Sequence, residues 1–132
     1  MAAVLDTHAA IWYLLDAKNL SETVFSLIDS AAASGAPTYI SAVSLVEVVY
    51  LVERRRIAAH AYERFADELD KDNPAFTVVS LDARIADVLR KIPRDVVPDM
   101  PDRIIAATAL HLDLPLVTRD RRLQAAGIKT IW

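Results

Sequence analysis

Short apolar runs alternate along the chain with longer segments in which apolar residues recur at helical spacing. Continuous apolar runs are typical of buried strands, whereas recurrence at every third or fourth position is typical of helices that bury one face. The apolar runs predict five strands, over residues 2–5, 38–40, 76–81, 116–118 and 128–131. The segments between them are long enough for helices.

Capping and stop residues mark several helix ends. Ser21 precedes an amphipathic segment that is ended by Gly35 and Pro37, and Asp82 caps a segment that runs through Leu89. A loop with three prolines spans residues 93–101, where proline restricts the backbone. The other predicted helices cover residues 9–15, 44–56, 59–71, 103–112 and 120–126.

The alternation of strands and helices predicts an α/β fold. Nearly continuous apolar strands are typical of a parallel sheet that is covered on both faces. The chain shows no internal repeat, low-complexity tract or linker, so we expect residues 1–132 to form a single domain. The expected architecture is a parallel sheet of four to five strands with helices on both faces.

The composition excludes several kinds of site. The chain has no cysteine, which excludes disulfides, thiolate zinc sites and cysteine nucleophiles, and its two glycines cannot form a glycine-rich phosphate loop. No basic region precedes an apolar one at the N-terminus, and no apolar run is long enough to span a membrane. We therefore expect a cytoplasmic protein without a membrane partner.

Charge is small overall but unevenly distributed. Fifteen Lys and Arg oppose 18 Asp and Glu, and this net charge of −3 argues against a protein that coats nucleic acid through excess positive charge. Residues 1–53 hold six acids and a single basic side chain, Lys18. The surplus of acids in this part of the chain needs an explanation.

Two of the acids come directly after predicted strands. Asp6 follows the first strand, and Asp120 lies two residues beyond the fourth. Ligands of an open parallel sheet bind beyond the carboxyl ends of its strands. Glu47 lies in the helix after the second strand, so we place it at the same edge. Asp102 opens a helix after the proline-rich loop, which could return to either edge.

Each of these acids also has a purely structural interpretation as part of a helix cap. Asp6 or Thr7 could cap the first helix, and Asp120 could cap the short last one. Two pairs have the spacing of a capping box, namely Ser44 with Glu47 and Asp99 with Asp102.

Taken together, the acids are harder to explain as caps. Two carboxylates about 4 Å apart repel each other by about 4 kcal/mol at an effective dielectric of about 20, so several in one crevice need a compensating charge. A hard cation would supply it, and carboxylate oxygens are the ligands that Mg²⁺ and Mn²⁺ prefer.

Four segments of the chain carry a resemblance to a known family. They are Asp6-Thr7-His8-Ala9, Ser44-Leu45-Val46-Glu47, Asp99-Met100-Pro101-Asp102-Arg103-Ile104-Ile105-Ala106-Ala107-Thr108-Ala109 and Leu114-Pro115-Leu116-Val117-Thr118-Arg119-Asp120. In order and spacing they resemble the PIN-domain nucleases, and within them the VapC-type toxins of toxin–antitoxin pairs. The resemblance spans essentially the whole chain, and the block that begins at Asp102 is its most specific part.

The resemblance implies a quartet of acids that binds Mg²⁺ or Mn²⁺. Carried over by position, the metal ligands and catalytic residues are Asp6, Glu47, Asp102 and Asp120. Thr7 and Thr118 are then candidates to hold these acids in place, and Asp99 either supports the site or caps its helix.

The implied function is a metal-dependent endoribonuclease, the toxin of a toxin–antitoxin pair. The metal would activate a water molecule to attack a phosphodiester bond of RNA and would neutralise the charge that develops there. The same resemblance implies an RNA substrate, a cognate antitoxin and a homodimer.

Positive side chains near the acids could hold RNA. The candidate phosphate contacts are Arg103, Arg119, Arg121 and Arg122. Arg103 could equally pair with a neighbouring carboxylate. The arginines at positions 54–56 are more simply a solvated helix face.

Histidine and aromatic positions favour structural roles. The three histidines are scattered along the chain, so no zinc site is expected, and His8 is expected to pack or hydrogen-bond locally. Trp12, Tyr13 and Tyr50 lie at helical positions typical of a core, although a partner surface is the alternative.

Other functions would use the same acids differently. A PIN nuclease that is not a toxin shares the quartet, and a PIN-like binding module is disfavoured because all four positions are filled. A haloacid-dehalogenase-like phosphatase would need an aspartate where His8 stands. A receiver domain could use Asp82 as its acceptor but would need an acidic pair at the first strand.

Overall fold

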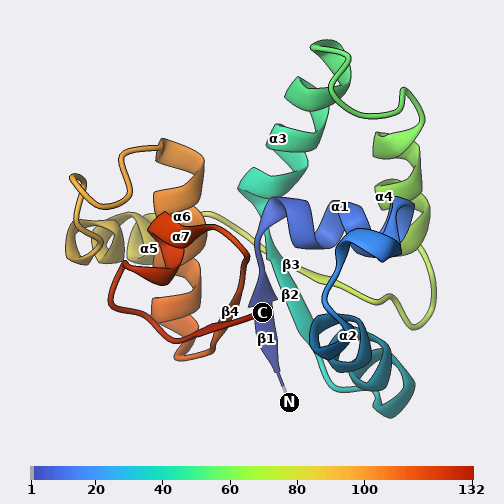
Figure 1. The fold of residues 1–132 in the computed structure, drawn as a ribbon, viewed down its shortest axis with the longest axis horizontal. Helices are drawn as coiled ribbons and strands as arrows, with labels where there is room; N and C mark the ends of the chain where they lie inside the picture. The colour runs from blue at the N-terminus through green and yellow to red at the C-terminus, as the bar shows by residue number, and fades with distance from the viewer. Residues whose placement is uncertain (1) are drawn as a thin grey trace.

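The computed structural model describes residues 2–132, in which five parallel strands form one sheet in the order β3-β2-β1-β4-β5 (Figure 1). The strands are β1 (Ala3–Leu5), β2 (Thr38–Ser41), β3 (Thr77–Val79), β4 (Leu116–Val117) and β5 (Thr130–Ile131). The predicted α/β fold with a parallel sheet is confirmed. All strands except β2 are shorter than the apolar runs that predict them. Buried side chains such as Phe76 extend the apolar run beyond the residues that pair in the sheet.

Within residues 2–132, seven α-helices and two 3₁₀-helices connect the strands. The α-helices are α1 (Thr7–Leu15), α2 (Glu22–Ser34), α3 (Ala42–Glu53), α4 (Ala61–Leu69), α5 (Ala83–Val88), α6 (Met100–Leu112) and α7 (Arg121–Gln124). The 3₁₀-helices η1 (Ala17–Asn19) and η2 (Leu89–Lys91) are not predicted by the sequence pattern. No helix in the described part of the chain has the length and apolar character needed to cross a bilayer.

Helix ends follow the predicted caps with one exception. Ser21 and Asp82 cap α2 and α5, and Gly35 ends α2 at a φ of 74°, a conformation that favours glycine. The predicted start of α3 at Ser44 is wrong, because the Ser41 side chain accepts from the backbone N–H of Val43 and starts the helix earlier. The capping box predicted for Ser44 and Glu47 is therefore absent at this helix end.

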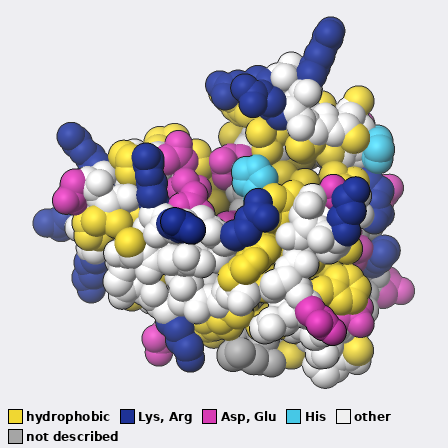
Figure 2. All heavy atoms as spheres, in the orientation of Figure 1, with side chains coloured by type: hydrophobic (Ala, Val, Ile, Leu, Met, Phe, Trp, Pro, Cys, Tyr) yellow, Lys and Arg dark blue, Asp and Glu magenta, His cyan; other side chains and the backbone are white. Residues whose placement is uncertain are grey.

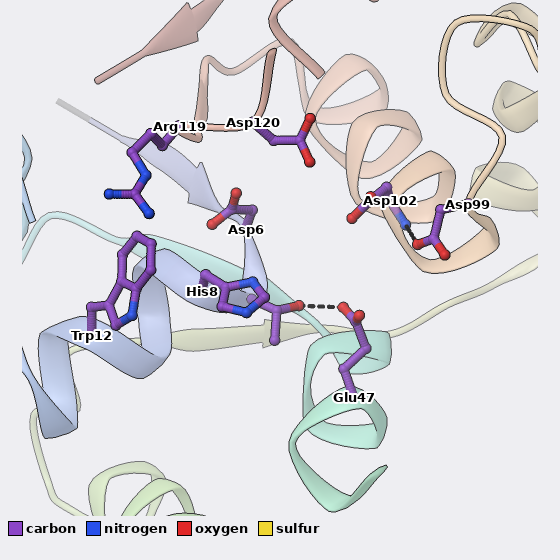
Figure 3. A pocket seen from close by; sticks show the side chains of 9 residues that line it. Asp6, His8, Trp12, Glu47, Asp99, Asp102, Arg119 and Asp120 are labelled. Atoms are coloured by element: carbon purple, nitrogen blue, oxygen red, sulfur yellow. Dashed lines mark hydrogen bonds between the residues drawn. The ribbon is translucent and has the colours of Figure 1, made fainter. Parts of the chain in front are cut away.

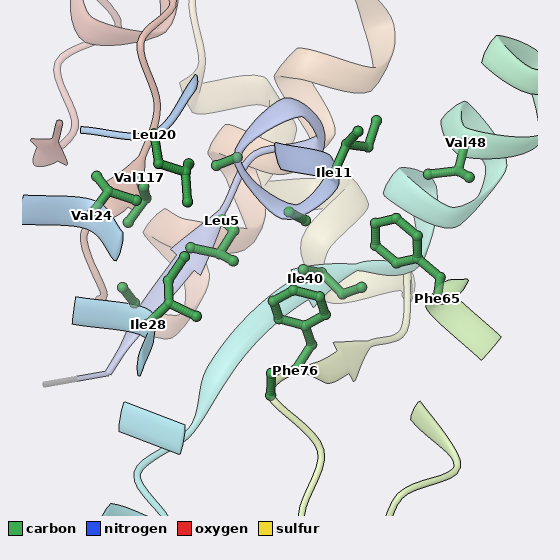
Figure 4. Packing of buried hydrophobic residues seen from close by; sticks show 14 of the residues in the cluster. Leu5, Ile11, Leu20, Val24, Ile28, Ile40, Val48, Phe65, Phe76 and Val117 are labelled. Carbon is green, nitrogen blue, oxygen red and sulfur yellow. The ribbon is translucent and has the colours of Figure 1, made fainter. Parts of the chain in front are cut away.

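The two faces of the sheet carry separate hydrophobic clusters. On one face, Leu5, Ile40 and Val117 pack against α1 to α4 (Figure 4). On the other, Val4 and Leu116 pack against α5 to α7. Neighbouring residues of a strand thus serve opposite clusters, as the two-residue period of a strand requires. The prediction of helices on both faces is confirmed.

The strand order places a switch point between β1 and β4. From β1 the chain moves outward through β2 to β3, and then returns to the other side of β1 to form β4 and β5. The connections after β1 and β4 therefore leave in opposite directions, which opens a crevice at the carboxyl ends of these strands.

Candidate active site

A cavity of about 470 Å³ lies beyond the carboxyl ends of β1 and β4 (Figure 3). Its lining residues are Asp6, Thr7, His8, Trp12, Glu47, Asp99, Asp102, Arg119 and Asp120. The cavity thus brings together the four acids of the expected quartet, which come from three helix starts and α3. In the space-filling view, acidic side chains gather in a hollow at the centre of one face, with basic side chains around it (Figure 2).

Asp6 is both a helix cap and a cavity residue. Its Oδ1 accepts from the backbone N–H of Ala9 at 2.8 Å and caps α1, while its Oδ2 accepts from the Thr118 hydroxyl at 2.5 Å. The residue is 8% exposed. Burial raises the pKa of Asp6 above its ordinary value against the effect of these two hydrogen bonds, and the charge of Asp120 adds to the rise.

Thr118 connects Asp6 to Asp120. Its buried hydroxyl donates to Asp6 and accepts from the backbone N–H of Asp120 at 3.0 Å. The Oδ1 of Asp120 in turn accepts from the N–H groups of Arg122 and Leu123 and caps α7. The cap therefore fixes the direction in which the carboxylate of Asp120 enters the cavity.

Glu47 reaches the cavity from α3. Its Oε1 accepts a hydrogen bond from the Thr7 hydroxyl, which lies 2.9 Å from the hydroxyl of Ser44. Burial raises the pKa of Glu47, the bond from Thr7 opposes this rise, and the charge of Asp99 adds to it. Thr7 and Thr118 thus each hold one of the acids.

Asp102 lies in the first turn of α6. Asp99 caps this helix, because its Oδ2 accepts from the backbone N–H of Asp102 at 3.3 Å. Burial, together with the charges of Asp99, Glu47 and the other acids, raises the pKa of Asp102 to about 7. Half of the Asp102 side chains would therefore carry a proton near neutral pH in the protein alone.

In the described part of the chain, the acids of the cavity form no ion pair. The ion pairs among residues 2–132 all lie elsewhere and join Lys18 to Asp16, Lys71 to Glu68 and Arg90 to Asp87. The raised pKa values of Asp6, Glu47 and Asp102 share one origin, since each of these carboxylates is at least partly buried beside others of like charge.

The chemistry of this donor set fits a hard divalent cation. All the acidic donors are carboxylate oxygens, which Mg²⁺ and Mn²⁺ prefer, and a cation would offset their mutual repulsion. As placed in the described residues, no three of these acids are close enough to one another to hold one ion. Asp6, Glu47, Asp102 and Asp120 are the residues that could hold a metal after adjustment of their side chains.

The four candidate arginines have different surroundings. Arg119 lines the cavity, whereas Arg121 and Arg122 are exposed on α7 and do not line it. Arg103 does not face the cavity either, because its guanidinium donates to the carbonyls of Leu89 and Ile92 at 3.0 and 2.9 Å. Arg103 forms no ion pair with a carboxylate among residues 2–132, its contact to phosphate stays a prediction, and its side chain joins η2 to α6.

Aromatic residues next to the acids were the part of the site that sequence reasoning missed. Trp12, expected in the core, is half-buried and lines the cavity, with its ring 5.6 Å from the ring of His8. Tyr50, also expected in the core, is 54% exposed, whereas Tyr13 packs against Phe76. The four-residue spacing of His8 and Trp12, which places both on one helix face behind Asp6, was the available signal.

The chain was compared with known proteins. The model of the PIN domain family matches residues 3–129. Ribonuclease VapC22 of Mycobacterium tuberculosis is 28% identical over 123 residues, which are 92% of this chain and 89% of that protein.

Solved structures share the fold. VapBC2 from Rickettsia felis bound to a promoter DNA fragment has a TM-score of 0.75 at 14% identity and covers 99% of this chain and 98% of its own. A toxin–antitoxin complex from Klebsiella pneumoniae has a TM-score of 0.66 at 22% identity, with 98% and 96% coverage. The match to the family model extends over nearly the whole chain, and this protein therefore belongs to the PIN domain family.

Proposed function

We propose that this protein is a metal-dependent endoribonuclease and the toxin of a toxin–antitoxin pair. The observation that carries the proposal is the convergence of Asp6, Glu47, Asp102 and Asp120 on one cavity, where none of them forms an ion pair with another residue of the range 2–132. The similarity to a ribonuclease over 92% of the chain supports the choice of RNA as substrate. Asp82 caps α5 and does not line the cavity, which disfavours the receiver alternative.

The residues of the chain would prepare the site for hydrolysis. A bound Mg²⁺ or Mn²⁺ would activate water and offset the negative charge of the phosphodiester. Thr118 fixes the Oδ2 of Asp6, and Thr7 fixes Glu47, so both acids meet the cation in set directions. Asp102, whose pKa is raised to about 7 by burial and by the neighbouring acids, would lose its proton when the cation binds, because a metal ligand must be deprotonated.

The partners follow from the same site. The similarity of the fold to a toxin–antitoxin complex supports an antitoxin partner, and a basic side chain of that partner would find uncompensated acids in the cavity. A homodimer is supported by Val46 and Tyr50 on α3, which are 52% and 54% exposed at a four-residue spacing.

The decisive experiment is RNA cleavage by the purified chain, freed of any partner, in Mg²⁺ or Mn²⁺. We expect Asp6→Asn and Asp102→Asn each to lower the cleavage rate by about 100-fold or more, and EDTA to stop it. Asp113→Asn is the matched control, because Asp113 is an exposed acid at the far end of α6 with a φ of 54° that asparagine tolerates.

Equal cleavage by the wild type and both cavity variants would refute the metal mechanism. Growth arrest on expression, lost in Asp6→Asn and Asp102→Asn but kept in Asp113→Asn, distinguishes a toxin from another PIN nuclease. A small neighbouring reading frame for an antitoxin-like protein would agree with the toxin assignment.

A further inference from the structure

Arg119 is the arginine that lines the acidic cavity, and two tryptophans hold it. Its guanidinium carbon lies 4.5 Å from the ring centroid of Trp12 and 5.9 Å from that of Trp132. The two indoles meet edge to face, with centroids 5.9 Å apart and planes at 69°. We call Arg119, Trp12 and Trp132 the arginine cage.

The cage is built from distant parts of the chain. Trp12 belongs to α1, Arg119 precedes the cap of α7, and Trp132 ends the chain. His8 packs on Trp12 from the cavity side, with ring planes at 51° (Figure 3). Trp12 thus contacts both His8 and Trp132, and these contacts limit the positions open to the ring on which the guanidinium rests.

The hydrogen-bond donors of Arg119 are free. Across residues 2–132, its guanidinium donates no hydrogen bond and forms no ion pair within 4.0 Å, although acids line the same cavity. A guanidinium that is bound through its face to an aromatic ring keeps the N–H groups in its plane available. Two parallel N–H groups match the oxygens of a phosphate.

An acidic cavity that acts on a polyanion needs a positive group at its entrance. The carboxylates repel phosphate, whereas a fixed arginine beside them attracts and orients it. Arg103 does not line the cavity, and its Nη2 donates instead to the carbonyls of Leu89 and Ile92. Arg121 and Arg122 lack an aromatic support among the described residues.

We propose that Arg119 binds a backbone phosphate of the RNA at the entrance of the acidic cavity, and that Trp12 and Trp132 are positioning residues for its guanidinium. The proposal rests on the proposed nuclease function and deepens it, since it names the group that places the RNA backbone next to the metal-binding acids. A structural role, in which the cage only attaches the C-terminus to α1, predicts no effect on RNA affinity beyond its effect on folding.

The test measures binding without cleavage. A short labelled single-stranded RNA is titrated into the full chain carrying Asp102→Asn, in EDTA, and anisotropy gives the affinity at several salt concentrations. In this background we expect Arg119→Ala to weaken binding about tenfold and to reduce the slope of log affinity against log salt by roughly 0.7, the loss of one phosphate contact. Arg84→Ala, which changes an exposed arginine on α5, is the matched control and should alter neither.

The tryptophans provide a second readout, because the chain has two and both belong to the cage. RNA should change the intrinsic tryptophan emission when Arg119 is present. Trp12→Leu should weaken binding about threefold, and Trp12→Phe, which keeps an aromatic face, should restore it. Thermal melts establish that each variant is folded.

Three results would overturn the proposal, namely unchanged affinity and salt slope in Arg119→Ala, tryptophan emission that does not respond to RNA, or equal binding by Trp12→Leu and Trp12→Phe. If the wild type cleaves RNA but Arg119→Ala does not change RNA affinity, the phosphate-binding role of Arg119 is rejected and the nuclease function is kept. Arg119-dependent binding without any cleavage would reject the nuclease and keep the phosphate site.

Discussion

The buried acid of α4 and the acids of the cavity differ in what surrounds them. Glu68 is 6% exposed, and its two oxygens accept from the backbone N–H of Ala75 and from Lys71, each at 3.0 Å. Burial acts to raise the pKa of Glu68, but these two bonds outweigh it and leave the pKa below its ordinary value. Asp102 receives no such bond within residues 2–132, and burial beside other acids raises its pKa to about 7.

The contrast separates a carboxylate that stabilises the fold from one that we propose acts in the site. Where the chain supplies its own donors, as for Glu68, the charged form is stabilised and the acid contributes to the fold. Where the chain instead surrounds a carboxylate with like charges, as around Asp102, the charged form is destabilised, and a bound cation would stabilise it. Variants that add or remove donors and charges should therefore affect folding at one site and activity at the other.

Among these variants the largest effect is expected at Thr118, which lies behind the cavity and donates to its Asp6. Thr118→Val keeps the volume but removes the hydrogen bond to Asp6, so we expect RNA cleavage to fall by about 10-fold to 100-fold. Thr108→Val is the control, because Thr108 is equally buried but bonds only the carbonyl of Ile104 in its own helix. Equal activity of the two variants would show that the hydroxyl of Thr118 does not support the site.

At Glu68 the expected effect is on stability. Glu68→Ala leaves the N–H of Ala75 buried without a partner and should lower the free energy of unfolding by about 2 kcal/mol, as measured by urea denaturation. Glu68→Gln keeps an acceptor for that N–H and should cost less than about 1 kcal/mol, because Lys71 is largely exposed. The cleavage rate of both folded variants should stay within about twofold of the wild type.

The pH dependence of Glu68→Gln extends this comparison. Because the folded-state pKa of Glu68 is lowered, its contribution to stability is present above the ordinary value of 4.5 and disappears as the pH falls through the folded-state pKa. The difference in the free energy of unfolding between wild type and Glu68→Gln should decrease in that pH range. A difference that stays constant down to low pH would assign the stabilisation to packing.

The smallest effect is expected for the stability of Asp102→Asn. The pKa of Asp102 is higher in the folded state, so the protein loses stability as the pH rises from about 4 to about 7 and the carboxylate ionises. Without metal, Asp102→Asn should be more stable than the wild type by about 1 kcal/mol at pH 8, a value reduced by solvent screening, and equal to it at pH 4. A variant less stable at pH 8 would show that the Asp102 charge has a favourable partner.

Much of the fold could be predicted because local rules and tertiary packing agree in this chain. The caps at Ser21 and Asp82 and the stop at Gly35 lie where the sequence places them. The start of α3 could not be distinguished from sequence, since Ser41 and Ser44 both precede an apolar run, and the side chain of Ser41 makes the capping bond. The end of β3 depends on pairing with β2, a property of the assembled sheet.

The candidate site was predictable where topology determines position. Asp6 and Asp120 follow strands that end at the same edge, so their proximity needs only a parallel sheet. The cap and cavity interpretations of these acids, which look like alternatives in the sequence, both hold in the structure. The contact of Trp12 with Arg119 and the position of Arg103 depend on packing between distant segments, which proximity to an acid in the sequence does not indicate.

The bond between Thr118 and Asp6 spans 112 positions of the chain, which has a consequence for synthesis on the ribosome. The first strand is made early and acquires β2 as soon as residues 38–41 emerge, but its other edge stays open until β4 leaves the exit tunnel. Until then the chain lacks Asp120, Arg119 and Thr118, whose hydroxyl donates to Asp6. The cavity is thus completed only after β4 and Asp120 have been made, so a nascent chain that stops before β4 contains Asp6 and Glu47 without Thr118 and Asp120.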